Sequence, residues 1–267
     1  MARRLARCTV LLTFDYDAES REALVAADRP VKLSKGQFGP RVGLRRVLRL
    51  LDKYEISSTF FVPGWTAEKY PESIKEIVRR GHEVAAHGYM HENLSELNSP
   101  EDEIEIFRKS IETLTKITGR RPIGYRAPHW EFSPSTVSNL MRFGFRYDSS
   151  LMNDEKPYII TFDGKPTGMV ELPVEWFLDD WPIFEIERRP PSEVFSIWMQ
   201  EFEAIYVERV PYFLLTMHPQ CIGRASRTMM LETLIRKIKT KNVVFSTCAD
   251  LADRVRHTGF SAARALF

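Results

Sequence analysis

The sequence predicts an α/β fold in which helices cover a mainly parallel β-sheet, and three observations predict it. Short apolar runs rich in β-forming residues recur along the whole chain, and amphipathic helical patterns separate them. The length of 267 residues suits one α/β barrel. Seven or eight strand–helix repeats favour closure of the sheet into a barrel, although an open sheet would show the same periodicity. Since no linker or low-complexity tract divides the sequence, residues 1–267 are expected to form a single domain.

The predicted strands are mostly continuous apolar runs of strand length, as is typical of strands covered on both faces. They span residues 8–14, 58–62, 83–87, 123–127, 145–148, 169–174, 212–217 and 243–247. Two longer stretches, 18–40 and 152–168, lack such a pattern and are expected to be irregular. Loops after the carboxyl ends of parallel strands build active sites, so both stretches could wall a pocket.

Amphipathic spacing predicts the helices between these strands. In residues 41–54, leucine and valine recur at the spacing of one helical face while arginines point away. The helix at 100–118 has clear ends, with Ser99 as N-cap, Pro100 in the first turn and Gly119 as the stop. Further helices are predicted at 71–80, 133–144, 192–209, 227–239 and 249–256.

Composition narrows the class of protein. A formal net charge of +2 provides no concentrated basic face, so neither nucleic acid nor an anionic membrane is an expected partner. The odd set of Cys8, Cys221 and Cys248 has no short paired spacing, which indicates buried, reduced thiols. An arginine-rich start precedes the apolar run 8–14, but this run is too short for a secretory signal and lacks a cleavage site. We therefore expect a cytoplasmic protein without a membrane span.

Polar residues that could bind a metal or take part in catalysis follow the first and third predicted strands. Asp15 and Asp17 stand two residues apart where a strand ends, and His87 and His91 stand four apart. Histidines at this spacing meet on one side if the chain turns helically. Two imidazoles and one carboxylate make a divalent metal site with positions left open for water. Each pair alone is weak evidence, because aspartate is common in turns and paired histidines also arise by chance.

Two further groups lie at later strand ends. Arg126 opens a segment that ends in Trp130, and His218 precedes a proline. A buried guanidinium can hold a carboxylate in place. Taken singly, the first group fits a proline-bounded turn and the second fits an ordinary hydrogen-bonded histidine.

In order, these four groups resemble the signature motifs of the polysaccharide deacetylase family (NodB homology, carbohydrate esterase family 4). The matching segments are Thr-Phe-Asp-Tyr-Asp at 13–17, His-Gly-Tyr-Met-His at 87–91, Arg-Ala-Pro-His-Trp at 126–130 and Leu-Thr-Met-His-Pro at 215–219. The likeness spans residues 9–250. It implies a distorted (β/α) barrel of about seven parallel strands, of the NodB type, and a metal-dependent hydrolase of carbon–nitrogen bonds other than peptide bonds.

Carried over residue by residue, the resemblance implies a metal site and a catalytic pair. The metal ligands would be Asp17, His87 and His91. The ion is expected to be zinc, with cobalt, nickel or manganese as alternatives. Asp15 would be the general base and His218 the general acid.

Arg126 would orient Asp15, and in the family a further carboxylate supports this arrangement. The chain departs from the family pattern here, and Asp148 and Asp180 compete for that role. The residues expected to line the substrate pocket are Tyr16, Trp130, Asp148, Asp180 and Trp181.

The expected chemistry follows from these residue types. A bound divalent ion lowers the pKa of its water from about 15.7 towards 7 and polarises a carbonyl oxygen. Asp15 would take a proton from that water, and His218 would protonate the departing nitrogen. Each well-placed acid or base contributes roughly 10²–10⁴-fold in rate.

A second likeness bears on the substrate. Residues 36–43 and 87–92 are similar to the subgroup of Helicobacter-type peptidoglycan deacetylases, cyclic imidases and allantoinase-like hydrolases. The favoured substrate is an acetylated amino sugar or its oligomer, and the alternative is a cyclic imide or ureide. A third possibility, a catalytically silent carbohydrate-binding relative, is disfavoured because both acid and base are present. The subgroup also implies a cytosolic homo-oligomer, a dimer or tetramer.

Overall fold

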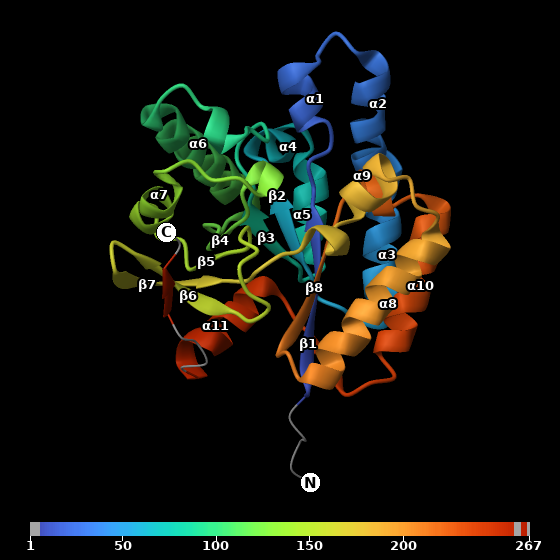
Figure 1. Cartoon of the computed structure of the whole chain (residues 1–267). Coiled ribbons are helices and arrows are strands. Elements are labelled where there is room, and N and C mark those ends of the chain that lie inside the picture. The colour runs from blue at the N-terminus through green and yellow to red at the C-terminus, as the bar shows by residue number, and fades with distance from the viewer. Residues whose placement is uncertain (1–5, 259–262, 266–267) are drawn as a thin grey trace.

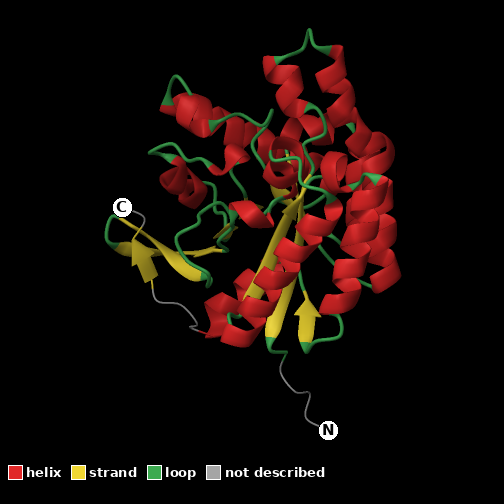
Figure 2. Ribbon diagram, turned by 45° about the vertical axis from the view of Figure 1, so that its right-hand side comes forward, coloured by secondary structure: helices red, strands yellow, loops and turns green. Residues whose placement is uncertain are grey.

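The computed structural model describes residues 6–258 and 263–265, and in it a mainly parallel sheet runs through the molecule with helices packed around it (Figures 1 and 2). The strands are β1 (Cys8–Asp15), β2 (Thr59–Val62), β3 (Glu83–Ala86), β4 (Gly124–Tyr125), β5 (Tyr147–Asp148), β6 (Tyr158–Phe162), β7 (Lys165–Glu171), β8 (Tyr212–Met217), β9 (Val243–Phe245) and β10 (Ala263–Ala265).

Strand β1 is the centre of this sheet. The hydrogen-bonded order is β10-β6-β7-β5-β4-β3-β2-β1-β8. Along its other edge β1 pairs first with β9 and then, from Thr13 onward, with β2. All of these pairs are parallel except β6–β7. The pairings among the described residues form an open path, and a parallel bridge between Asp179 and Thr216 continues it beyond β8. The predicted α/β fold with parallel strands is confirmed.

Helices flank the sheet on both sides. The α-helices are α1 (Ser20–Val25), α2 (Pro30–Phe38), α3 (Leu44–Tyr54), α4 (Gly64–Lys69), α5 (Pro71–Arg79), α6 (Pro100–Thr118), α7 (Thr136–Arg142), α8 (Pro191–Glu208), α9 (Pro219–Ile222), α10 (Ala225–Ile238) and α11 (Cys248–Thr258). Two π-helical turns, η1 (Gly39–Gly43) and η5 (Pro182–Ile186), and three 3₁₀ turns, η2 (Leu94–Glu96), η3 (Pro128–Trp130) and η4 (Trp176–Leu178), complete the elements. Helices α3, α8 and α10 lie on one side of β1 and β8, and α6 and α7 lie on the other (Figure 1).

Helix α6 shows how local sequence sets an element. The Ser99 hydroxyl accepts from the backbone N–H of Asp102, and the Asp102 carboxylate accepts from the backbone N–H of Ser99, a capping box. Gly119 ends the helix with φ +73°. One face buries Phe107 and Leu114 against the sheet side of the molecule. The helix predicted at 100–118 is therefore confirmed with the same bounds.

Two stretches expected to be irregular contain regular structure. Residues 18–40 form α1, α2 and the start of η1, and in Figure 1 the α1–α2 hairpin projects beyond the carboxyl end of β1. Both helices are short and weakly amphipathic, so periodicity does not reveal them. Residues 152–168 contain β6, which forms an antiparallel hairpin with β7. Its two-residue turn is Asp163-Gly164, both at positive φ. Asp-Gly is the usual sequence of such a turn, so the signal was present.

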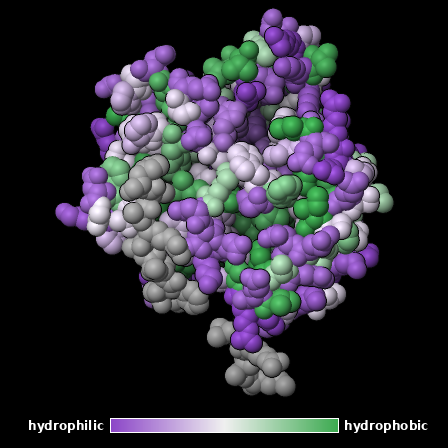
Figure 3. All heavy atoms as spheres, in the orientation of Figure 1, coloured by the Kyte–Doolittle hydropathy of each residue, from purple (hydrophilic) through white to green (hydrophobic). Residues whose placement is uncertain are grey.

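On the face seen in Figure 3, apolar side chains are scattered among hydrophilic ones. The α1–α2 hairpin carries Leu24, Val25 and Val31, all exposed. No helix within the described residues is long and apolar enough to cross a membrane. All three cysteines are buried and none forms a disulfide.

Candidate metal centre and catalytic site

The polar residues singled out from the sequence meet at one cavity at the carboxyl ends of the strands. The cavity has a volume of about 340 Å³. Its lining comprises Asp15, Asp17, Ala18, Arg21, Glu22, Gly36, His87, His91, His129, Trp130, Trp176, Asp179, Trp181, Pro182, Ile186, His218 and Gln220. The side chains come from loops after β1, β3, β4 and β8 and from the α1–α2 and η4–η5 segments. A parallel sheet explains this convergence, because all its strands end at the same edge.

Asp17, His87 and His91 form a compact group of potential metal ligands. One ligand atom from each lies within 4.8 Å of the others. His87 Nε2 is 3.6 Å from Asp17 Oδ1, and His91 Nε2 is 3.9 Å from Asp17 Oδ2. Asp17 Oδ1 is buried without a hydrogen-bond partner. A buried carboxylate that faces two imidazole nitrogens and has one oxygen without a donor fits a divalent cation.

A backbone carbonyl beside His87 fixes which ring nitrogen carries the proton. His87 Nδ1 lies 2.7 Å from the carbonyl oxygen of Arg126. Because a carbonyl only accepts, Nδ1 carries the proton and Nε2 presents its lone pair to Asp17. Gly88 follows with φ +67°, and a side chain there would meet Pro128 at 3.0 Å. The chain can therefore turn sharply and bring His91 back to the same centre.

Burial sets the charge of the three ligands. It lowers the pKa of His87 to about 4 and that of His91 well below its ordinary value, so both imidazoles are neutral. It raises the pKa of Asp17 to about 7. A divalent cation would favour the ionised form of this carboxylate.

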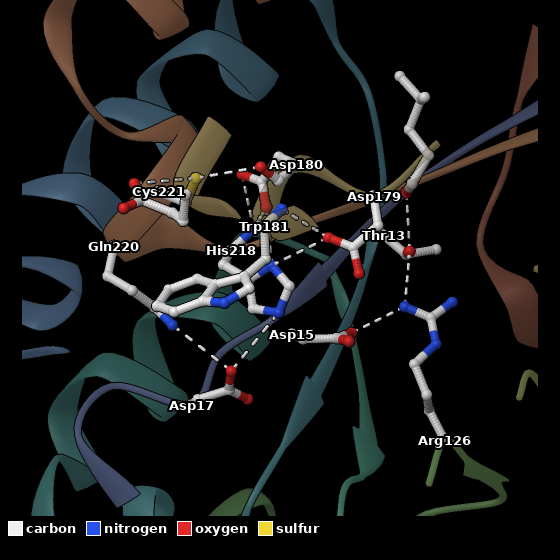
Figure 4. Close-up of polar contacts among 12 residues, drawn as sticks. Thr13, Asp15, Asp17, Arg126, Asp179, Asp180, Trp181, His218, Gln220 and Cys221 are labelled. Atoms are coloured by element: carbon white, nitrogen blue, oxygen red, sulfur yellow. Dashed lines mark hydrogen bonds and ion pairs between the residues drawn. The ribbon is translucent and has the colours of Figure 1, made fainter. Parts of the chain in front are cut away.

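Asp15 is held by Arg126, which is fully buried (Figure 4). One guanidinium nitrogen donates to Asp15 Oδ1 at 2.7 Å and to the Thr13 hydroxyl at 2.9 Å. The other nitrogens donate to the backbone oxygen and hydroxyl of Ser149. Burial opposes ionisation of Asp15, but the charge and hydrogen bond of Arg126, together with the charged ring of His218, outweigh it and hold the pKa of Asp15 below its ordinary value. Its other oxygen lies 3.9 Å from His87 Nε2, and Asp15 lines the cavity.

His218 lines the same cavity as Asp15. Its Nδ1 is 2.7 Å from Asp180 Oδ1, and its backbone N–H donates to both oxygens of Asp180. Asp179 adds a second carboxylate at 3.6 Å. Burial disfavours the charged ring, but Asp179, Asp180 and Asp17 outweigh it and raise the pKa of His218 well above its ordinary value. Nε2 of this imidazolium is 3.6 Å from Asp17 Oδ2 and can donate a proton towards the centre.

Three of the five expected pocket residues lie elsewhere. Tyr16 is fully buried and does not line the cavity, because alternate residues of an extended segment point to opposite sides and Asp15 and Asp17 take the cavity side. Asp148 is also fully buried, beside Ser150 and opposite Glu171 in β7. The expectation that Tyr16 and Asp148 line the substrate pocket is therefore wrong.

Asp180 also lies behind the lining, where it supports His218 rather than Arg126. Arg126 is held by Thr13 and Ser149, so no hydrogen bond joins it to either Asp148 or Asp180. Trp130 and Trp181 do line the cavity.

Several lining residues were not selected from the sequence as site residues. Asp179 directly precedes Asp180, and Gln220 follows His218-Pro219, so adjacency to a selected residue was the available signal. His129, within the segment 126–130, packs its ring 4.7 Å from that of His91. Asp179, Asp180 and His218 are also close enough to hold a metal, but Asp180 already occupies His218 Nδ1.

Comparisons with known proteins agree with this geometry. The sequence pattern of the polysaccharide deacetylase family matches residues 3–147, more than half of the chain. The peptidoglycan deacetylase of Helicobacter pylori is 35% identical over 258 residues, covering 85% of this chain and 88% of that protein. A Mycobacterium smegmatis structure assigned to the polysaccharide deacetylases superposes with a TM-score of 0.89 at 36% identity, covering 100% of this chain and 96% of that one.

The structure of the allantoinase PuuE superposes with a TM-score of 0.87 at 24% identity, covering 95% of this chain and 91% of that one, which is a likeness of fold. The matched region of the family pattern contains Asp15, Asp17, His87, His91 and Arg126. The protein belongs to the polysaccharide deacetylase family and is a hydrolase that acts on carbon–nitrogen bonds other than peptide bonds.

Proposed function

We propose that the protein is a metal-dependent N-deacetylase of acetylated amino sugars, free or in an oligomer. One observation carries this proposal: an ionised carboxylate and a protonated imidazole flank the same potential metal site, Asp15 beside His87 and His218 beside Asp17. Hydrolysis of an acetamido group needs a base for water and an acid for the departing nitrogen. The similarity to the Helicobacter pylori peptidoglycan deacetylase supports the choice of substrate.

The proposed roles follow from atom positions. Asp17, His87 and His91 would hold a divalent cation, which when bound supplies Lewis-acid chemistry to water and to the amide carbonyl. Asp15, kept ionised by Arg126, accepts a proton from the attacking water. His218 Nε2 gives its proton to the nitrogen as the carbon–nitrogen bond breaks, so that acetate and an amine leave.

The aromatic residues of the cavity support a sugar substrate. Trp130 and Trp176 pack with ring centroids 4.5 Å apart, and Trp181 lies 5.7 Å from the ring of His218. Their flat faces suit the apolar face of a pyranose ring. Trp176 is half exposed, so a ring bound against it could continue into solvent.

A cyclic imide or ureide is the second candidate. The volume of about 340 Å³ favours it, since this is small for several sugar units at once. A substrate panel distinguishes the two candidates. The protein, stripped of metal and reloaded with Zn²⁺ or Co²⁺, is incubated with N-acetylglucosamine oligomers, succinimide and hydantoin, and free amine and ring-opened acid are measured. Release of acetate from the oligomers is expected; turnover of the rings alone would overturn the first choice.

The remaining expectations belong to the same proposal. Zinc is favoured because two neutral imidazoles and one carboxylate suit it, and cobalt, nickel or manganese could bind the same ligands. A homo-oligomer is supported by the exposed apolar residues of the α1–α2 hairpin, and light scattering would test it. The three buried thiols fit a cytoplasmic protein.

A further inference from the structure

Gln220 lines the cavity beside the proposed metal site and has no role in the catalysis described above. It is the second residue of α9, directly after His218-Pro219, and its side chain is almost fully buried. Its amide Nε2 donates to Asp17 Oδ2 at 3.4 Å (Figure 4). Among the described residues, no other side chain donates a hydrogen bond to that carboxylate.

This contact distinguishes the two oxygens of Asp17. Oδ2 receives the Gln220 amide and lies 3.9 Å from His91 Nε2, while Oδ1 has no hydrogen-bond partner and faces His87 Nε2 at 3.6 Å. A carboxylate can only accept, so the donor must be Nε2. The amide oxygen of Gln220 therefore points the other way, where it is buried without a partner beside Gly39.

The π-helical turn η1 holds Gln220 in this position. A side-chain carbon at Gly43 would lie 1.9 Å from the carbonyl oxygen of Pro219, so only glycine allows η1 to pack against the turn that carries Gln220. A carbon at Gly39 would lie 3.4 Å from the amide oxygen of Gln220, which shows that η1 also passes directly beside this side chain. The turn η1 thus forms the wall behind Gln220. Single π-turns of this kind are often found at functional sites.

We propose that Gln220 is a positioning residue that orients the Asp17 carboxylate towards His87 and His91, where the metal would bind. Residues that bond the outer side of a metal ligand fix its orientation, and their loss typically weakens metal binding by roughly 10–100-fold. The inference rests on the metal site of the proposed function. It concerns the strength of cation binding and not the identity of the substrate.

The test measures metal affinity directly. Zn²⁺ binding is measured by competition with a chromogenic chelator, and the site geometry is followed by the visible absorption of bound Co²⁺. Gln220→Met, which keeps the length of the side chain but cannot donate, is expected to bind Zn²⁺ roughly 10–100-fold more weakly and to change the Co²⁺ spectrum. Gln200→Met, at an exposed amide of α8, is the matched control and should bind like the wild type.

A second variant covers the case in which Gln220→Met does not fold. Gln220→Asn keeps an amide but is one methylene too short to reach Asp17, so the same weakening is expected. The thermal midpoint of each metal-free variant is recorded to show that the fold is retained. Wild-type affinity in both variants would overturn the inference, as would a raised KM with unchanged affinity, which would make Gln220 a substrate contact. A wild-type protein that binds no cation would instead overturn the proposed function, and this inference with it.

Discussion

The pairing of His218 with Asp180 allows a sharp test of the proposed general acid. Asp180→Asn keeps the shape of the side chain and can still accept from the His218 backbone, but it removes the negative charge 2.7 Å from Nδ1. The pKa of His218 is raised because Asp179, Asp180 and Asp17 together outweigh burial. Loss of one of these charges should therefore lower that pKa and deprotonate the acid at a lower pH.

The expected loss in kcat/KM depends on the carboxylate that Asp180→Asn leaves beside His218. A general acid contributes roughly 10²–10⁴-fold in rate, which corresponds to about 2.7–5.5 kcal/mol of barrier. Asp179 stays in place 3.6 Å from His218 Nδ1 and keeps part of the stabilisation of the imidazolium. We therefore expect the lower end of this range, a loss of roughly 10²-fold in kcat/KM, and a larger loss at high pH.

The assay is the pH dependence of kcat/KM for metal-loaded protein, measured on whichever substrate the wild type turns over. The falling limb at high pH should move to lower pH in Asp180→Asn. Asp163→Asn, in the exposed turn between β6 and β7, is the control for a lost surface charge. An unchanged falling limb, with kcat/KM within twofold of the wild type, would refute the role of His218 as the acid.

The other predictions concern the metal ligands, the base and a buried carboxyl pair. His91→Ala should retain no metal after dialysis, and equal metal by elemental analysis would contradict the ligand assignment. Asp15→Asn should keep its metal and lose roughly 10²–10⁴-fold in rate. A metal-loaded variant with full activity would contradict the role of Asp15 as the general base. Since Asp17 has a pKa of about 7, Zn²⁺ affinity should fall about tenfold per pH unit below that value, which titration by calorimetry at several pH values would check. Burial and the neighbouring Asp148 raise the pKa of Glu171. The folded protein therefore loses stability as the pH rises from the ordinary glutamate pKa through the raised one. Glu171→Gln should melt at the wild-type temperature at pH 5 and at a higher temperature than the wild type at pH 9, which thermal denaturation would check.

Local signals were enough for much of the fold. The strand at β1 was evident because it is apolar and covered on both faces, and α6 because its capping box and closing glycine lie in the sequence itself. The hairpin of β6 and β7 was missed although its Asp163-Gly164 turn was visible. Helices α1 and α2 carry little amphipathic signal, and they fold where they do because they close over a cavity that other segments make.

The sequence alone determined which residue types could do the chemistry and in which order they occur, because a motif at a strand end can be recognised whatever the spatial order of the strands. It could not determine the partners of each group. That Asp180 supports His218, that Asp148 pairs with Glu171, and that Ser149 holds Arg126 are results of strand register and of loops packed from distant parts of the chain. Charges acquire their pKa values from such neighbours and from burial, and both exist only once the sheet has brought its carboxyl ends together.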